Sequence, residues 1–227
     1  MSERPADPRF QERLTAWFAP DVYRFGIPLF VVSGLAWGLG APIVAAVFGG
    51  LGLFVAAFFR NPARTILEGD LLVIAPADGR VIEVGEIETA DGKKALRIGI
   101  FLSVFNVHVN RAPVPGRVVS IERSGDAYLA AFNREAETRN VRCAMTLAMA
   151  DGRQVGVVQI TGLIARRILC HPEIGEWLDR GVRYGLIRFG SRTDVVLPLG
   201  SKALVERGAR VRGGSTVIAE LEGEEAA

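Results

Sequence analysis

The chain has 227 residues, and its 27 Lys and Arg residues nearly balance 25 Asp and Glu residues, which leaves a formal net charge of +2. A charge this small gives no argument for nucleic acid as a partner. Two histidines and two unpaired-looking cysteines argue against a multi-histidine metal centre and against a zinc or redox cysteine motif, so no metal site is expected. Any imidazole chemistry must then use His108 or His171.

Residues 1–60 are expected to form a lead-in and a membrane anchor. Apolar side chains at helical spacing within residues 1–25 predict an amphipathic segment. Residues 26–59 carry no charge, a run longer than the roughly 20 residues of one spanning helix and shorter than two such helices. Glycines and Pro42 interrupt the run near its middle. We therefore expect a helical hairpin that dips into or crosses the bilayer; the alternative is a buried helix pair of a soluble core.

Basic residues flank this hydrophobic run on both sides. Arg24 precedes it, and Arg60 and Arg64 follow it. Because lysine and arginine are enriched on the cytoplasmic side of membrane segments, both ends of the hairpin are expected to be cytoplasmic. The sequence therefore predicts a protein of the cell membrane whose following domain lies on the cytoplasmic face.

The sequence pattern of residues 61–227 predicts a single β-rich domain. Short β-branched runs alternate with Gly, Pro and Asp turns roughly every ten residues, which is typical of antiparallel sheets. No helix–strand alternation and no glycine-rich nucleotide motif occur. The expected fold class is α+β and β-rich, mainly antiparallel, with the helical hairpin in front. Residues 75–86 and 205–221 share a strand beside a glycine turn, as do the halves of barrel-sandwich carrier domains.

Two hypotheses arise at Gly200-Ser201-Lys202. Lys202 at a hairpin tip would suit a biotinyl- or lipoyl-like carrier or binding module on a membrane anchor, with the chain intact. Alternatively, Gly200 leaves its carbonyl open to attack by the Ser201 hydroxyl, and the resulting ester can eliminate and hydrolyse to a pyruvoyl group. A serine needs an activating base or strain for this reaction, and most Gly-Ser pairs are plain turns. The dipeptide alone does not decide between these functions.

Four blocks stand out in order along the chain: PADGRV at 76–81, FLSVFNVHVNRAPVPGRV at 101–118, GLIRFGSRTDVVLP at 185–198 and LGSKALVERGARVRGGSTVIAEL at 199–221. Together they resemble the phosphatidylserine decarboxylase family in its short, membrane-anchored form. The resemblance implies an enzyme that makes its own pyruvoyl cofactor by cutting within an LGST-like motif. Leu199-Gly200-Ser201 match that motif, whereas Lys202 departs from its threonine. The expected products are chains 1–200 and 201–227, held together as a heterodimer.

The resemblance also implies roles for single residues. Asp78 matches an aspartate linked to self-cleavage, and a carboxylate can orient and polarise an imidazole. His108 matches a histidine tied to catalysis. Some members have a second histidine where this chain has Arg111, so whether His108 serves cleavage, decarboxylation or both stays open. The planar fork of Arg192 could hold a phosphate or carboxylate of the substrate, or the residue could be an ordinary surface arginine.

The implied reaction is the decarboxylation of phosphatidylserine to phosphatidylethanolamine and carbon dioxide. The pyruvoyl group at residue 201 would act as the electron sink, and His108 would protonate the carbanion. The substrate is a membrane lipid, which would explain a hydrophobic anchor. No nucleic acid is expected as a partner, and assembly into a homo-oligomer stays open.

Overall fold

The computed structural model describes residues 18–19, 21–89, 92–130, 135–163, 167–187 and 190–223. Most of the amphipathic segment expected at residues 1–25 lies outside these ranges. The chain divides into two compact units, Met1–Ala63 and Arg64–Ala227. Each unit is described by itself.

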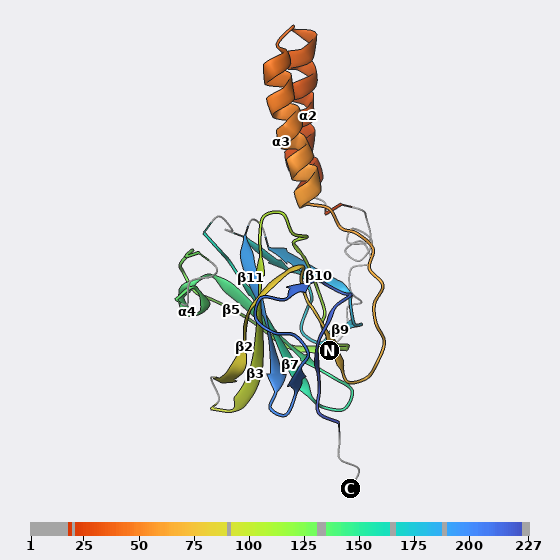
Figure 1. The fold of residues 1–227 in the computed structure, drawn as a ribbon, viewed down its shortest axis with the longest axis vertical. Coiled ribbons are helices and arrows are strands. Elements are labelled where there is room, and N and C mark those ends of the chain that lie inside the picture. The colour runs from red at the N-terminus through yellow and green to blue at the C-terminus, as the bar shows by residue number, and fades with distance from the viewer. Residues whose placement is uncertain are drawn as a thin grey trace. The chain divides into compact units, whose positions relative to one another are not determined.

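The first unit contains two helices that lie side by side (Figure 1), α2 (Asp21–Gly38) and α3 (Pro42–Phe58). Between them the chain turns at Gly40, whose φ of 73° is readily adopted only by glycine, and Pro42 occupies the start of α3. The Ser33 hydroxyl donates to the Ala45 carbonyl at 2.7 Å and so links the two helices. Within the described residues, no helix combines the length and the hydropathy that crossing a membrane requires.

The second unit is built almost entirely from strands. Their bounds are β1 (Leu72–Ile74), β2 (Gly79–Glu88), β3 (Lys94–Leu102), β4 (Val109–Arg111), β5 (Gly116–Ser124), β6 (Arg142–Ala148), β7 (Gln154–Ile160), β8 (Ile168–Cys170), β9 (Trp177–Leu178), β10 (Arg183–Ile187), β11 (Ser191–Pro198), β12 (Lys202–Ala203), β13 (Arg210–Val211) and β14 (Val217–Glu220). One short helix, α4 (Ala136–Arg139), lies between β5 and β6.

These strands form one large curled sheet and two small ones (Figure 1). The large sheet has eight strands in the order β13-β2-β3-β11-β7-β6-β5-β9, and the small sheets have the orders β1-β14-β12 and β4-β10-β8. All pairs between these strands are antiparallel, which confirms the β-rich, mainly antiparallel fold predicted from the sequence. Alternate residues of the central strands fill the core, among them Ile98, Ile100, Val157, Val195 and Leu197.

The two similar segments noted in the sequence lie against each other. Gly79 of β2 pairs with Val211 of β13, and the amide of Ala75 donates to the Thr216 carbonyl at 2.8 Å. Gly79 also passes so close to β3 that a β-carbon there would lie 2.3 Å from the carbonyl oxygen of Phe101. No other residue fits at this position without a shift of the backbone, so Gly79 fixes the start of β2 and the turn just before it.

A buried ion network covers the centre of the large sheet, on the face opposite to Val195 and Leu197. Arg192 donates through Nε to Asp194 at 2.5 Å and through Nη2 to Glu83 at 2.6 Å. Arg97 donates to the other oxygen of Glu83 at 2.5 Å. Burial raises the pKa of Asp194, and the charge of Arg192 opposes that shift. Two guanidinium groups and two carboxylates therefore neutralise one another across β2, β3 and β11.

This network predicts that Arg192→Ala destabilises the domain. The Asp194 side chain is only 3% exposed, so removing Arg192 leaves a buried carboxylate without its main partner, at a cost of about 3–5 kcal/mol in the free energy of unfolding. Arg207→Ala removes the same charge from an exposed position and should change the free energy by less than about 0.5 kcal/mol. Urea unfolding of the purified proteins measures both values. Equal stability of the two variants would contradict this structural role.

Candidate active site

Strand pairing brings the starts of β2 and β11 to the same end of the large sheet. Phe101, near the end of β3, pairs with Arg80 of β2 on one side and with Arg192 of β11 on the other. The residues just before those two strands therefore flank the end of β3. Asp78 lies there before β2, and Gly190 lies there before β11.

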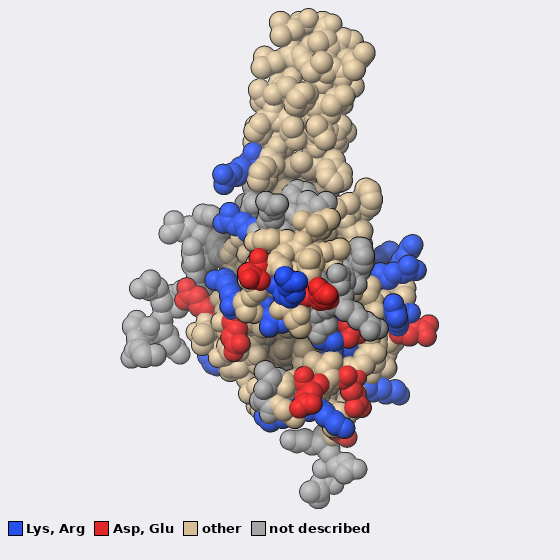
Figure 2. Space-filling model, turned by 90° about the vertical axis from the view of Figure 1, so that its left-hand side faces the viewer, with Lys and Arg blue, Asp and Glu red and all other residues tan. Residues whose placement is uncertain are grey.

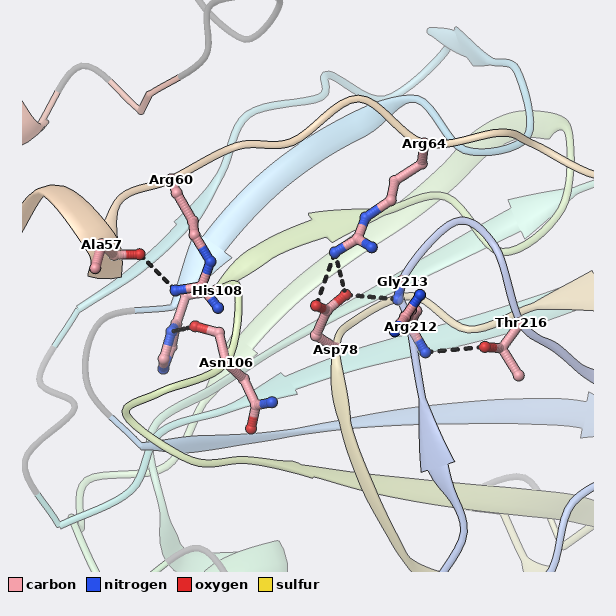
Figure 3. Close-up of polar contacts among 9 residues, drawn as sticks. All are labelled: Ala57, Arg60, Arg64, Asp78, Asn106, His108, Arg212, Gly213 and Thr216. Carbon is pink, nitrogen blue, oxygen red and sulfur yellow. Dashed lines mark hydrogen bonds and ion pairs between the residues drawn. The ribbon is translucent and has the colours of Figure 1, made fainter.

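The imidazole of His108 is buried, and its orientation is fixed. Its Nδ1 lies 2.9 Å from the carbonyl oxygen of Asn106, which can only accept, so Nδ1 carries the proton (Figure 3). Asn106 is itself held by the amide and the hydroxyl of Ser103, which donate to its Oδ1 at 2.9 and 2.8 Å. The backbone amide of Gly190 donates to Nε2 at 3.4 Å. The lone pair of Nε2 therefore faces the start of β11.

A Gly-Ser bond lies at that point, between Gly190 and Ser191. Gly190 has a φ of 68°, in the left-handed region that glycine adopts readily. Ser191 is fully buried, and its hydroxyl has no hydrogen-bond partner among the described residues. A buried hydroxyl without a partner is costly in a native protein, and a catalytic role, a ligand or a bound water molecule is the usual explanation. Gly190-Ser191 therefore offers the same glycine carbonyl and serine hydroxyl that the sequence argument assigned to Gly200-Ser201, and it also has a histidine in contact with the glycine.

A polar cluster ties the strand of Ser191 to the strand that follows His108. Asn110 of β4 donates to the Thr193 hydroxyl of β11 at 3.2 Å, and Gln159 of β7 donates to the Asn110 side chain at 2.7 Å. All three side chains are buried. Such a cluster holds neighbouring elements in one arrangement, so it fixes β4 against β11 and with them the spacing between His108 and Ser191.

Asp78 lies at the same end of the sheet but does not bind His108. Arg64 Nη2 donates to its Oδ1 and Oδ2 at 3.1 and 2.8 Å, and the amide of Gly213 donates to Oδ1 at 2.8 Å (Figure 3). The carboxylate–imidazole pair expected from the sequence is therefore not formed, and the partners of the Asp78 carboxylate are Arg64 and the amide of Gly213. Asp78 instead fixes the turn that leads to the bond between Gly214 and Ser215.

Gly200 and Ser201 lie at the far end of β11. The strand runs from Ser191 to Pro198, which at about 3.3 Å per residue separates the two ends by about 23 Å. The Ser201 hydroxyl donates to the Pro198 carbonyl at 2.8 Å. The structure thus does not bring Ser201 together with His108 or Asp78. A pocket borders Ser201, lined by Arg153, Pro198, Leu199, Leu221, Glu222 and Gly223.

Arg192 is also not placed as the sequence argument supposed. Neighbouring residues of a strand point to opposite faces, so Arg192 faces away from the side of Ser191. Its guanidinium is hydrogen-bonded to Asp194 and Glu83, and only 5% of its side chain is exposed. A role in holding an anionic substrate would require it to leave two carboxylates.

The sequence analysis missed Gly190, Ser191 and the cluster around Asn110. The chain contains three Gly-Ser pairs, beginning at Gly190, Gly200 and Gly214. The usable signal was the block that contains the first pair, GLIRFGSRTDVVLP, which belongs to the same resemblance as the block around His108. Which pair meets the histidine depends on long-range strand pairing, and local sequence does not show it.

Comparison with known proteins gives a consistent result. The model of the family described as phosphatidylserine decarboxylase matches residues 51–219. Proteins named phosphatidylserine decarboxylase proenzyme from Burkholderia ambifaria, Burkholderia cenocepacia and Burkholderia vietnamiensis are each 44% identical to this chain, over 89% of it and 97% of their own length. The chain therefore belongs to the phosphatidylserine decarboxylase family.

Proposed function

We propose that this protein is a self-processing decarboxylase that converts phosphatidylserine to phosphatidylethanolamine and carbon dioxide. Family membership and the word proenzyme in the names of its relatives support the reaction and the processing. The observation that carries the assignment of the site is the imidazole of His108, whose Nε2 faces Gly190 beside the buried Ser191 hydroxyl. We therefore assign self-cleavage to the Gly190-Ser191 bond instead of the Gly200-Ser201 bond.

The cleavage chemistry can be written with groups of this chain. The Ser191 oxygen attacks the Gly190 carbonyl carbon while Nε2 of His108 takes the hydroxyl proton, and the peptide bond is exchanged for an ester. Loss of the Ser191 α-proton then breaks its Cβ–O bond and frees the Gly190 carboxylate. Addition of water and loss of ammonia leave a pyruvoyl group at residue 191. The buried Ser191 hydroxyl fits this role because no group within the described part of the chain holds it in a competing hydrogen bond.

A pyruvoyl group at residue 191 would supply an electron sink for the bond that releases carbon dioxide. The chain provides the proton transfer and the positioning. The Nδ1 of His108 carries a proton and donates it to the carbonyl of Asn106, so the Nε2 of the ring is the nitrogen that can accept and return a proton. Complete burial of His108 and Ser191 keeps bulk water away from the reacting carbon. The cluster of Asn110, Thr193 and Gln159 preserves the spacing of these two residues through both reactions.

We further propose that the unit Met1–Ala63 attaches the protein to the cytoplasmic face of the cell membrane. Large apolar side chains on α2, on α3 and in the turn between them are exposed, and most of this surface carries no charge in Figure 2. The exposed set includes Phe30, Leu35, Trp37, Leu39, Ile43, Val47 and Leu53. Exposed apolar surfaces of this size are typical of membrane or protein contacts, and basic residues flank this one. Attachment would keep the enzyme beside a lipid substrate.

The assignment of the cleaved bond predicts different outcomes for three serine variants. Ser191→Ala should remain one uncut chain without decarboxylase activity, because no hydroxyl is left to attack Gly190. Ser201→Ala and Ser215→Ala should still be cut, into residues 1–190 and 191–227. Intact mass spectrometry of the purified proteins distinguishes these outcomes. Fragments that begin at residue 201 or 215, or an intact active chain with a modified Lys202, would contradict the assignment.

The membrane proposal predicts that charges on the turn of the hairpin weaken binding. Leu39 and Ile43 are 84% and 79% exposed, and replacing both with Asp should lower the liposome-bound fraction about tenfold or more, since a carboxylate is costly in lipid. Ile174→Asp changes an exposed apolar residue of the other unit and serves as the control. Flotation with liposomes of phosphatidylglycerol and phosphatidylethanolamine measures binding. Equal flotation of all three proteins would refute attachment through this hairpin.

A further inference from the structure

Arg111 lies among two further arginines, Arg183 and Arg64, and the carboxylate of Asp78. Arg111 of β4 lies directly opposite Arg183 of β10 in the strand pairing. Arg64, in the segment before β1, is hydrogen-bonded to Asp78. The charges of Arg183, Arg64 and Asp78 all act on Arg111. Among the described residues, the charged groups that act on Arg111 are two arginines and one carboxylate.

The cross-strand pair of Arg111 and Arg183 brings two like charges together. Like charges directly opposite each other in a sheet destabilise the strand pair. Arg111 is only 6% exposed, and its Nη1 donates to the Gly181 carbonyl at 3.0 Å. Burial first, and then Arg183 and Arg64, lower the pKa of Arg111 to about 10, while Asp78 opposes the shift. Arg111 thus stays cationic at neutral pH, and the repulsion is not relieved by loss of a proton.

Arg183 shows an unused binding capacity. Its Nε is buried and has no hydrogen-bond partner among the described residues, although the residue as a whole is half-buried and can be reached from solvent. A buried donor without a partner costs free energy unless a ligand or water satisfies it. The guanidinium fork of arginine matches the oxygens of a phosphate group, and such charge-assisted bonds are among the stronger hydrogen bonds of proteins.

We infer that Arg111, Arg183 and Arg64 form a binding site for a phosphate oxyanion, either the phosphodiester of a lipid headgroup or free phosphate. A bound anion would offset the repulsion between Arg111 and Arg183 and give the Nε of Arg183 an acceptor. Asn110 reaches Thr193, so strand alternation directs Arg111 to the opposite face of β4. The site is therefore distinct from the Ser191 hydroxyl, and its occupancy can be measured without turnover, whatever a decarboxylase assay shows.

Thermal unfolding of the detergent-solubilised full-length protein tests this site, with inorganic phosphate and glycerophosphoserine as probes at constant ionic strength. Each probe should raise the unfolding temperature of the wild type in a saturable way. Arg183→Gln should bind the probes about tenfold or more weakly, because it loses charge-assisted hydrogen bonds. Arg183→Lys, which keeps the charge but not the fork, should fall between the two. Arg207→Gln loses the same charge at an exposed position and should bind as the wild type does.

The effect of Arg183→Gln on thermal stability should have opposite signs in the empty site and in the site with a bound probe. Without a probe, Arg183→Gln should unfold at a higher temperature than the wild type, because the repulsion of Arg111 is gone; with saturating probe the order should reverse. Tighter binding of glycerophosphoserine would identify a lipid headgroup as the ligand, and tighter binding of inorganic phosphate would identify free phosphate. Absence of saturable stabilisation in the wild type, or equal affinities of Arg183→Gln and Arg207→Gln, would overturn the inference.

Discussion

The contact between the Nε2 of His108 and the backbone amide of Gly190 is the constraint on which the proposed chemistry depends. Three features converge on it. The Ser103–Asn106 turn fixes the imidazole, the Asn110–Thr193 hydrogen bond holds β4 against β11, and the pairing of β3 with β11 sets where Ser191 begins its strand. A change in any of them would move a base relative to a buried hydroxyl, and catalytic geometry tolerates only small displacements.

Arginine has two different tasks in this domain. Around Arg192, two guanidinium groups and two carboxylates balance and join three central strands of the sheet, with Glu83 as the most exposed member at 33%. Around Arg111, the described residues place two further arginines and one carboxylate. Like charges that face each other are costly unless a ligand offsets them, whereas removing one member of a balanced buried pair is strongly destabilising. Charge balance, which depends on partners distant in the chain, therefore distinguishes these two groups of arginines better than motif position does.

The strand content, the antiparallel class and the family were predictable from the sequence because they depend on local patterns. Alternating apolar residues and glycine turns predict strands, and ordered blocks around His108 and Asp78 indicate the family. The choice among three Gly-Ser pairs was not predictable, because each is a glycine turn in its own sequence context. Only the folded structure shows that Gly190, next to Ser191, contacts His108, and that Ser201 lies beyond the opposite end of β11. The task of Arg192 likewise depends on partners distant in the chain, such as Glu83.

The central claim, that residue 191 becomes the reactive carbonyl group, has a direct measurement. Processed enzyme is incubated with phosphatidylserine and cyanoborohydride, which links an amine to a carbonyl by reduction, and the product is mapped by peptide mass spectrometry. We predict that the added mass lies on residue 191 at the start of the 191–227 fragment. An added mass at residue 201, at residue 215 or on Lys202, with residue 191 still an internal serine, would contradict the claim.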